Sequence, residues 1–292
     1  MRAAAILGPG CSAKDLRRFQ RDDQIEWLRG LPDASDQVDI ILLFGGDGTI
    51  HRYLSQLVQL ATPVLVVPVG SGNDFARALG LSSVRDSVAL WRRFCAERGN
   101  IRVIDLGTIA SSPTEAGGAP ALHYFCSVAG LGLGSEVTRR ANRLPSWVRG
   151  HGGYAAALFP TLLRFAPFRM KITTQKASGH WETVSDQPTM LAAFANTPIY
   201  GGGMKIAPQA KMDDGQLDVC VIGGIDPFKL ARLFPTVYFG RHLKIREVQY
   251  FQAARMRVET EYPLDVYADG EFVCQTPVGF GVQREALKVL VP

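Results

Sequence analysis

The sequence has no apolar run long enough to cross a lipid bilayer. A spanning helix needs about 20 consecutive apolar residues, whereas the longest candidates, Val38–Phe44 and Leu60–Val69, have the length of strands and are interrupted by Asp39 or by proline. The five cysteines are far apart and form no Cys-x-x-Cys pair, which argues against zinc ribbons, redox motifs and a disulfide framework. We therefore expect a protein of a reducing compartment, the cytoplasm, that does not span a membrane.

Several local signatures of enzymes and of nucleic-acid-binding proteins are also missing. There is no Walker A motif, no Gly-x-Ser-x-Gly and no His-Glu-x-x-His, which disfavours P-loop enzymes, serine hydrolases and zinc proteases. There is no helix-turn-helix, zinc-finger or RNP signature, and the net charge of +5 is modest. We expect no nucleic acid among the partners.

The composition that remains is that of a globular chain. Hydrophobic residues make up 47% and charged residues 20% of 292 residues, a balance that excludes a disordered tail and a coiled-coil rod. Strand and helix patterns alternate up to Ile101–Leu106, and short strand patterns dominate from about Leu122 onward. With the small-residue linker Ile109–Ala121 between them, these patterns predict an α/β domain over residues 1–112 and a β-sandwich domain over 120–281.

Hydrophobic periodicity predicts the individual elements. Near-continuous aliphatic runs at Val38–Phe44 and Val64–Val67 are typical of strands covered on both faces in a parallel sheet. The predicted helices are Ser12–Leu28, Ile50–Leu60, Phe75–Leu79, Val84–Cys95, Glu136–Arg143, Tyr154–Phe165 and Phe228–Phe239.

A first glycine loop, Gly45-Gly46-Asp47-Gly48-Thr49, stands where a buried strand ends and a helix begins. Ligands bind at this place in α/β sheets, and the glycines leave backbone N–H groups open to an anionic phosphate. Asp47 is a candidate to hold Mg²⁺ or to orient a phosphoryl group, and Thr49 to donate its hydroxyl to a phosphate. The alternative is an ordinary tight turn in which Asp47 caps the helix.

A second glycine loop, Gly70-Ser71-Gly72-Asn73-Asp74-Phe75-Ala76, follows the next aliphatic strand and also opens a helix. Two such loops at adjacent strand ends can hold one nucleotide. Helix capping by Asn73 or Asp74 is again the alternative. Because Phe75 stands where Gly-x-Gly-x-x-Gly needs its last glycine, a Rossmann dinucleotide site is disfavoured.

Six motifs in chain order resemble those of the diacylglycerol kinase catalytic family. They are the two glycine loops, Asn196–Met204, Ala207-Pro208, Asp213–Asp218 and Ala268–Glu271. The resemblance covers most of the chain and implies an α/β nucleotide-binding domain, a C-terminal β-sandwich, and residues 282–292 folded back onto the first domain. It implies an ATP- and Mg²⁺-dependent lipid kinase that transfers the γ-phosphoryl group to the hydroxyl of diacylglycerol or a related lipid alcohol.

The resemblance also implies roles for particular residues. Glu271 is expected to accept the hydroxyl proton, and Asp47 to help place the metal and the γ-phosphate. A structural Mg²⁺ is expected at the Lys211 carbonyl, the Asp214 side chain and the Gln216 carbonyl. From the residues alone, a hairpin turn with a solvated glutamate and a plain turn without metal are the alternatives for these two segments.

Two segments depart from the family pattern and leave other functions open. The loop Gly8-Pro9-Gly10-Cys11-Ser12 retains only the proline of the usual Asn-Pro-x-Ser-Gly, and the acidic residue often found after the glycines of Gly130–Gly134 is missing. A catalytically weakened lipid- or nucleotide-binding protein is therefore one alternative. An NAD kinase is another, because NAD kinases share the Gly45–Thr49 motif.

The stretch between Glu136 and Glu182 holds eight basic residues and no acidic one, with aromatic residues between them. Cations beside amphipathic rings suit an anionic bilayer, so peripheral membrane contact is expected here in addition to a lipid alcohol substrate. A buried helix stripe with solvated arginines explains the pattern equally well. Whether the chain forms a homodimer is left open. The basic residues are Arg139, Arg140, Arg143, Arg149, Arg164, Arg169, Lys171 and Lys176.

Overall fold

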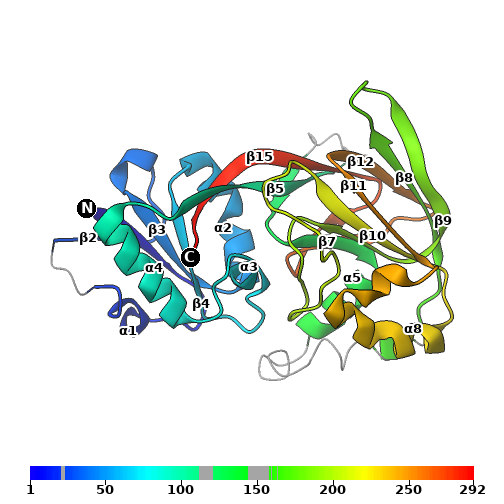
Figure 1. Ribbon diagram of the computed structural model, residues 1–292, viewed down its shortest axis with the longest axis horizontal. Coiled ribbons are helices and arrows are strands. Elements are labelled where there is room, and N and C mark those ends of the chain that lie inside the picture. Colours follow the sequence, from blue (N-terminus) through cyan, green and yellow to red (C-terminus); the bar gives the residue numbers. More distant parts are fainter. Residues whose placement is uncertain (21–23, 112–120, 144–157, 159, 163) are drawn as a thin grey trace. The chain divides into compact units, whose positions relative to one another are not determined.

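The computed structural model describes residues 1–20, 24–111, 121–143, 158, 160–162 and 164–292 (Figure 1). Contacts divide the chain into unit 1, Met1–Leu106 with Arg284–Pro292, and unit 2, Gly107–Gln283. The paired strands β5 (Ile101–Ser111) and β15 (Val278–Leu290) each contribute residues to both units. Among the described residues, no helix is both long and apolar enough to cross a membrane.

Unit 1 is built on a parallel sheet in which β15 is followed by β4, β3, β1 and β2. Every residue of β3 and β4 is buried, as the aliphatic runs predict. The strands are β1 (Arg2–Leu7), β2 (Glu26–Arg29), β3 (Ile40–Gly45) and β4 (Val64–Pro68). The helical elements are α1 (Ala13–Leu16), η1 (Ser35–Gln37), α2 (Asp47–Leu60), α3 (Asp74–Ala78) and α4 (Val84–Glu97).

The helix predicted over Ser12–Leu28 is wrong beyond its first turn. A capping box between Ser12 and Asp15 starts α1, which ends at Leu16, and Glu26–Arg29 form the parallel strand β2 beside β1. The ring of Trp27 packs on that of Trp91 with centroids 5.5 Å apart. This aromatic contact and the sheet pairing outweigh the helix-like spacing, because tertiary packing overrides a local pattern.

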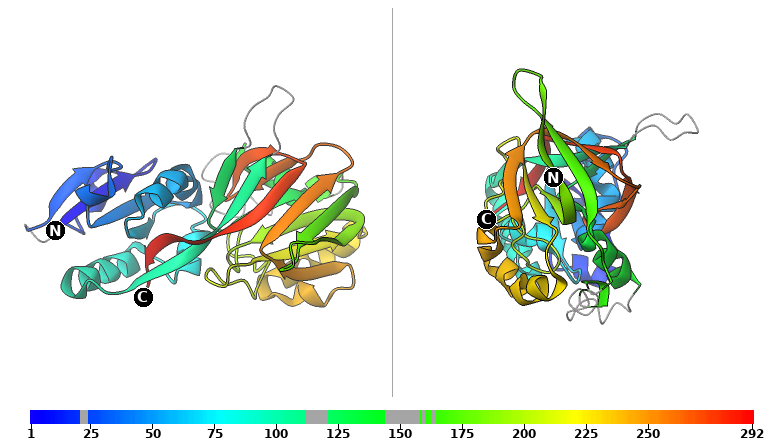
Figure 2. Two further views of the ribbon diagram at one scale, coloured as in Figure 1. Left: turned by 90° about the horizontal axis from the view of Figure 1, so that it is seen from above. Right: turned by 90° about the vertical axis from the view of Figure 1, so that its right-hand side faces the viewer.

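Unit 2 is an antiparallel β domain with helices packed on one face of its strands (Figures 1 and 2). Its remaining strands are β6 (Leu122–Phe125), β7 (Val128–Gly132), β8 (Phe168–Gln175), β9 (Trp181–Ala195), β10 (Leu217–Gly223), β11 (Val248–Ala253), β12 (Arg255–Thr260), β13 (Asp265–Ala268) and β14 (Glu271–Gln275). Its helical elements are α5 (Leu133–Asn142), α8 (Pro227–Leu233), η2 (Phe234–Phe239) and η3 (Arg241–Lys244). Half of the predicted helix Tyr154–Phe165 lies outside the described residues, and Leu158 and residues 160–162 within it are helical.

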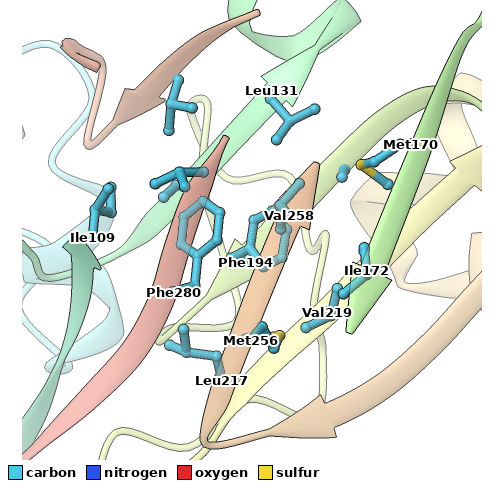
Figure 3. Packing of buried hydrophobic residues seen from close by; sticks show 14 of the residues in the cluster. Ile109, Leu131, Met170, Ile172, Phe194, Leu217, Val219, Met256, Val258 and Phe280 are labelled. Carbon is cyan, nitrogen blue, oxygen red and sulfur yellow. The ribbon is translucent and has the colours of Figure 1, made fainter. Parts of the chain in front are cut away.

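Two hydrophobic clusters hold unit 2 together. One lies among the strands, where the rings of Phe194 and Phe280 stack with centroids 3.8 Å apart beside Met256 and Val258 (Figure 3). The other joins β9 and β10 to α5, α8 and η2. Strands therefore form the sandwich core, and the helices cover a second apolar layer.

Candidate active site

The two glycine loops of unit 1 lie in backbone contact with each other. A Cβ added to Gly70 would lie 2.5 Å from the Gly46 Cα, and one added to Gly46 would lie 3.0 Å from the Gly70 Cα. A Cβ on Gly72 would lie 2.9 Å from Asp47 Oδ2. Glycine is therefore required here for loops to approach each other, in addition to leaving amides open to a ligand.

Asp47 connects the two loops through its side chain. Its carboxylate accepts hydrogen bonds from the backbone N–H groups of Asp74, at 3.1 Å, and of Phe75, at 3.0 Å. It stands in the first turn of α2, and its partners stand in the first turn of α3, so one carboxylate lies at the positive ends of two helices. Both the Mg²⁺ prediction and the helix-cap alternative placed Asp47 within its own loop, and neither included this bridge.

Asn73 closes the second loop rather than capping α3. Its Oδ1 accepts from the Gly70 N–H at 3.0 Å and its Nδ2 donates to the Gly70 carbonyl at 2.6 Å, while the Asn73 backbone has a φ of 54°. Asparagine is one of the few residues that tolerate this left-handed conformation. Asp74 is buried and pairs with Arg77 at 3.2 Å. These bonds hold the loop from Gly70 to the start of α3 in one shape.

The Gly8–Ser12 loop packs against the first glycine loop. Gly8 donates its N–H to the Phe44 carbonyl at 2.8 Å, and a Cβ at Gly8 would lie 2.8 Å from Thr49 Oγ1. A Cβ at Gly45 would lie 2.6 Å from the same hydroxyl oxygen. The Thr49 side chain thus fills the space beside Gly8 and Gly45, where neither glycine has a side chain. The Gly8–Ser12 loop, which departs from the family pattern, is therefore in close contact with the first glycine loop.

In unit 2, Asp269 anchors the turn that carries Glu271. It is 8% exposed, and its carboxylate accepts from the backbone N–H groups of Cys126 and Ser127, each at 2.8 Å. Asn142, at the end of α5, donates its Nδ2 to the Gly270 carbonyl at 2.8 Å. Glu271 itself is exposed at the start of β14. A buried carboxylate thus fixes the position from which an exposed one is presented to solvent.

The predicted Asn196 motif belongs to the same network. Asn196 is buried and donates its Nδ2 to the Cys126 carbonyl at 3.0 Å, and its own N–H donates to the Ser127 carbonyl at 2.8 Å. No sequence signal pointed to Cys126, Ser127 or Asn142. They contribute through loop backbone or from a helix end, and composition does not reveal such contacts.

The predicted metal turn carries the Asp214 carboxylate, and the buried carboxylate of Asp218 lies near it. Asp214 Oδ1 accepts from the Gln216 N–H at 3.0 Å. Gln252 Nε2 donates to Asp218 at 3.2 Å and lies 3.5 Å from Asp214 Oδ2. Burial raises the pKa of Asp218, and the Asp214 charge acts in the same direction. The described residues hold no group of three or more acidic, histidine or cysteine side chains placed to bind a metal ion together. One carboxylate with two backbone carbonyls still suits Mg²⁺, and a cation would offset the negative charges of Asp214 and Asp218.

Most of the described basic residues between Glu136 and Glu182 form ion pairs with acidic side chains. Arg139 and Arg140 both bind Glu136, at 2.7 and 2.8 Å, and these contacts lower the pKa of that carboxyl. The other pairs are Arg169–Asp186, Lys171–Glu259 and Lys176–Glu182, at 2.9, 3.9 and 3.0 Å. Arg149, with Trp147 and Tyr154, lies outside the described residues. Much of the basic charge is therefore balanced locally.

A nucleotide-binding N-terminal domain with two bridged glycine loops, joined to a C-terminal β-sandwich, defines the fold of the two-domain kinases. Comparisons with known proteins agree. Residues 12–109 match the diacylglycerol kinase catalytic domain, and residues 127–291 match the YegS C-terminal NAD kinase beta sandwich-like domain. A crystal structure of a diacylglycerol kinase from Bacillus anthracis has the same fold, with a TM-score of 0.69 at 17% identity over 100% of this chain and 96% of that one. An NAD kinase from Archaeoglobus fulgidus, solved with ATP, gives 0.55 at 15% identity over 99% and 93% of the two chains.

Sequence relatives carry the identification further. A diacylglycerol kinase of Mycobacterium tuberculosis is 35% identical over 254 residues, which is 87% of this chain and 77% of the relative. The diacylglycerol kinase of Bacillus subtilis is 27% identical over 261 residues, 89% of this chain and 80% of the relative. The chain belongs to the diacylglycerol kinase catalytic-domain family, and it is a lipid kinase. The predicted fold and enzyme class are confirmed.

Proposed function

We propose that this lipid kinase uses ATP with Mg²⁺ and transfers the γ-phosphoryl group to the hydroxyl of diacylglycerol or a related lipid alcohol. The lipid oxygen forms its bond to the γ-phosphorus as the bond from that phosphorus to the β–γ bridging oxygen breaks, and the hydroxyl proton passes to the Glu271 carboxylate. The observation that carries the proposal is the Asp47 bridge, which fixes two runs of backbone N–H groups at adjacent strand ends.

The chain's own residues divide the work in the following way. The amides of Gly45–Thr49 and of Gly70–Ala76 bind the phosphates, because helix N-termini and bare glycine backbone favour an anion. Asp47 positions the second loop and would help to place the γ-phosphate and the Mg²⁺ that neutralises its charge. Asp269 holds the turn of Glu271, so that the base keeps one position while the proton moves. The Lys211–Gln216 turn would hold a structural Mg²⁺ through one side chain and two carbonyls.

The acceptor and the place of action follow from the relatives and from the chemistry of the substrate. The relatives' name supports diacylglycerol, while the likeness to an NAD kinase concerns the fold alone. We propose that the enzyme works at an anionic membrane surface, where a lipid alcohol is found. The cytoplasmic location stays a prediction, and whether the chain forms a homodimer stays open.

A phosphoryl-transfer assay with matched variants tests this function. The purified protein is incubated with labelled ATP, Mg²⁺ and dioctanoylglycerol, and NAD is offered in a parallel reaction. Glu271→Gln should lower kcat by about a hundredfold or more, the usual contribution of a general base, whereas Glu182→Gln, an exposed carboxylate on β9, should leave it unchanged. A Glu271→Gln variant with the full rate would contradict the role of the base. Phosphorylated NAD without phosphorylated lipid would contradict the acceptor, and ATP binding without turnover would indicate a silent member of the family.

A further inference from the structure

Unit 2 exposes two phenylalanine rings on its helical layer. Phe228 is 74% exposed and Phe239 71%, more than any other large hydrophobic residue described, and Tyr238 beside them is 39% exposed. All three belong to the consecutive helical elements α8 and η2. Several large aromatic side chains exposed to solvent within one short segment indicate an interaction surface.

Within each of the two helical elements, exposed residues lie one turn apart. Phe228 and Arg232 are one α-helical turn apart, and in η2, with three residues per turn, Pro235 and Tyr238 are one turn apart. All four are exposed. The positions Leu230, Leu233, Phe234 and Val237 pack into the hydrophobic cluster that includes residues of β9 and β10. The exposed positions of α8 and η2 are therefore set by the packing of the apolar residues on the same elements.

The turn that follows holds Phe239 outward. A Cβ on Gly240, whose φ is 66°, would lie 3.1 Å from the Pro208 ring, so the backbone packs tightly at this point. His242 is 1% exposed, and its Nε2 lies 3.0 Å from the Ile206 carbonyl. These contacts hold η3 against residues 206–208, next to the exposed Phe239.

The same segment carries positive charge that is not balanced within it. Between Asp226 and Glu247 there are five cationic residues and no acidic one. Lys229 binds Glu247 at 2.5 Å, and Arg246 lies near the same carboxylate. Within the part of the chain that the structure describes, Arg232, Arg241 and Lys244 are exposed and form no ion pair. This differs from the Glu136–Glu182 stretch, whose described cations mostly have acidic partners.

We propose that the α8–η3 surface, defined as Phe228, Arg232, Tyr238, Phe239, Arg241 and Lys244, docks on a bilayer that contains anionic phospholipid. Rings set among unpaired cations match the boundary between phosphate headgroups and acyl chains, where the rings enter the apolar region and the cations remain at the phosphates. A ligand that offered acidic groups alone would satisfy the cations but would leave the rings in water. The inference rests on the proposed function because the lipid acceptor lies in that bilayer.

Vesicle binding by matched variants tests the surface. Co-sedimentation is measured with vesicles of phosphatidylglycerol and phosphatidylcholine, and with phosphatidylcholine alone. Phe228→Ser with Phe239→Ser should weaken binding to the anionic vesicles by about a hundredfold, since each buried ring contributes at least about tenfold. Tyr262→Ser, an aromatic residue 48% exposed elsewhere in unit 2, is the control and should have no effect.

Charge reversal tests the electrostatic part. Arg232→Glu with Arg241→Glu should weaken binding by at least about 25-fold, since each cation near an anionic surface is worth about fivefold. Arg85→Glu with Arg92→Glu, two exposed arginines on α4, changes the net charge equally and should have little effect. Wild-type protein should bind phosphatidylcholine vesicles more weakly than anionic ones.

The remaining outcomes are separable. Turnover of water-soluble dioctanoylglycerol should be unchanged in both double variants, so that a failure of the kinase proposal is seen independently of membrane binding. Absence of binding by the wild type, or equal losses in the controls, would overturn the docking surface. If light scattering shows that the wild type self-associates and the ring variants do not, with vesicle binding intact, the surface joins two copies of the chain and the membrane proposal is refuted.

Discussion

Replacing Asp47 by asparagine should release the start of α3 from the first glycine loop. The asparagine would keep one acceptor oxygen for the Phe75 N–H, but its amide group would face the Asp74 N–H, which the wild-type Oδ2 binds at 3.1 Å. Two donors would then point at each other. The variant would also lose the negative charge that lies at two helix N-termini.

The expected size of this effect follows from the bond that is lost. A hydrogen bond to a charged group contributes about 1.5 to 3 kcal/mol, and because Asp47 is half-buried we take the lower end, about 1.5 kcal/mol. A difference of about 1.4 kcal/mol is a factor of ten, so the amides of Asp74 and Phe75 should lose about tenfold of their protection against hydrogen exchange. For a domain of this size the melting temperature should fall by about 6 °C.

Amide hydrogen exchange is the decisive measurement because it reports the loop itself. Asp36→Asn, an exposed carboxylate in η1, makes the same charge change in unit 1 and should leave exchange at the start of α3 unaltered. If Asp47→Asn leaves the Asp74 and Phe75 amides as protected as in the wild type, the bridge does not hold the loop. A loss of ATP affinity without a change in exchange would indicate that Asp47 acts on the ligand alone.

The other predictions concern unit 2. Asp269→Asn should destabilise unit 2 by about 1.5 to 3 kcal/mol in urea unfolding and should lower kcat; a stable variant with reduced kcat would indicate a direct chemical role for the carboxylate. Burial lowers the pKa of His242 in the folded protein, so the unfolded chain takes up a proton more readily below about pH 6.5. The free energy of unfolding should therefore decrease as the pH is lowered below this value, by at most about 1.4 kcal/mol per pH unit. A His242→Gln variant with the same pH slope would refute this. Removal of Mg²⁺ by a chelator should lower the melting temperature of the wild type and have little effect on Asp214→Ala; equal shifts in both proteins would contradict the metal turn.

The sequence was sufficient to predict the loops but not the contacts between them. Glycine at strand ends indicated open amides at positions 45, 46 and 70. The structure adds that Gly46 and Gly70 touch, a contact between residues that hydrophobic periodicity cannot relate. The Asp47 bridge escaped prediction for the same reason, since a motif describes one loop at a time and the bridge joins two.

In unit 2, sequence reasoning found the carboxylates and missed what holds them. Asp269 and Glu271 were recognised through a short motif, yet the amides that bind Asp269 come from Cys126 and Ser127, more than a hundred residues earlier. Strand β2 was missed because four residues beside a helix-like pattern carry too little information, and its place is decided by pairing with β1. Long-range pairing is therefore the part of this fold that local patterns leave undetermined.

The last strand also has a consequence for the order in which the protein can be completed during synthesis. Val289 pairs with Val64 in β4, Leu287 and Leu290 are buried in unit 1, and Val291 donates its N–H to the Asn100 carbonyl at 2.9 Å. The ribosome must therefore add all of residues 107–283 before unit 1 can pair with the end of β15. At typical elongation rates this takes about 9 to 35 s. During that time β4 presents an open edge, and a chaperone that protects such an edge would act on this enzyme at its N-terminal domain.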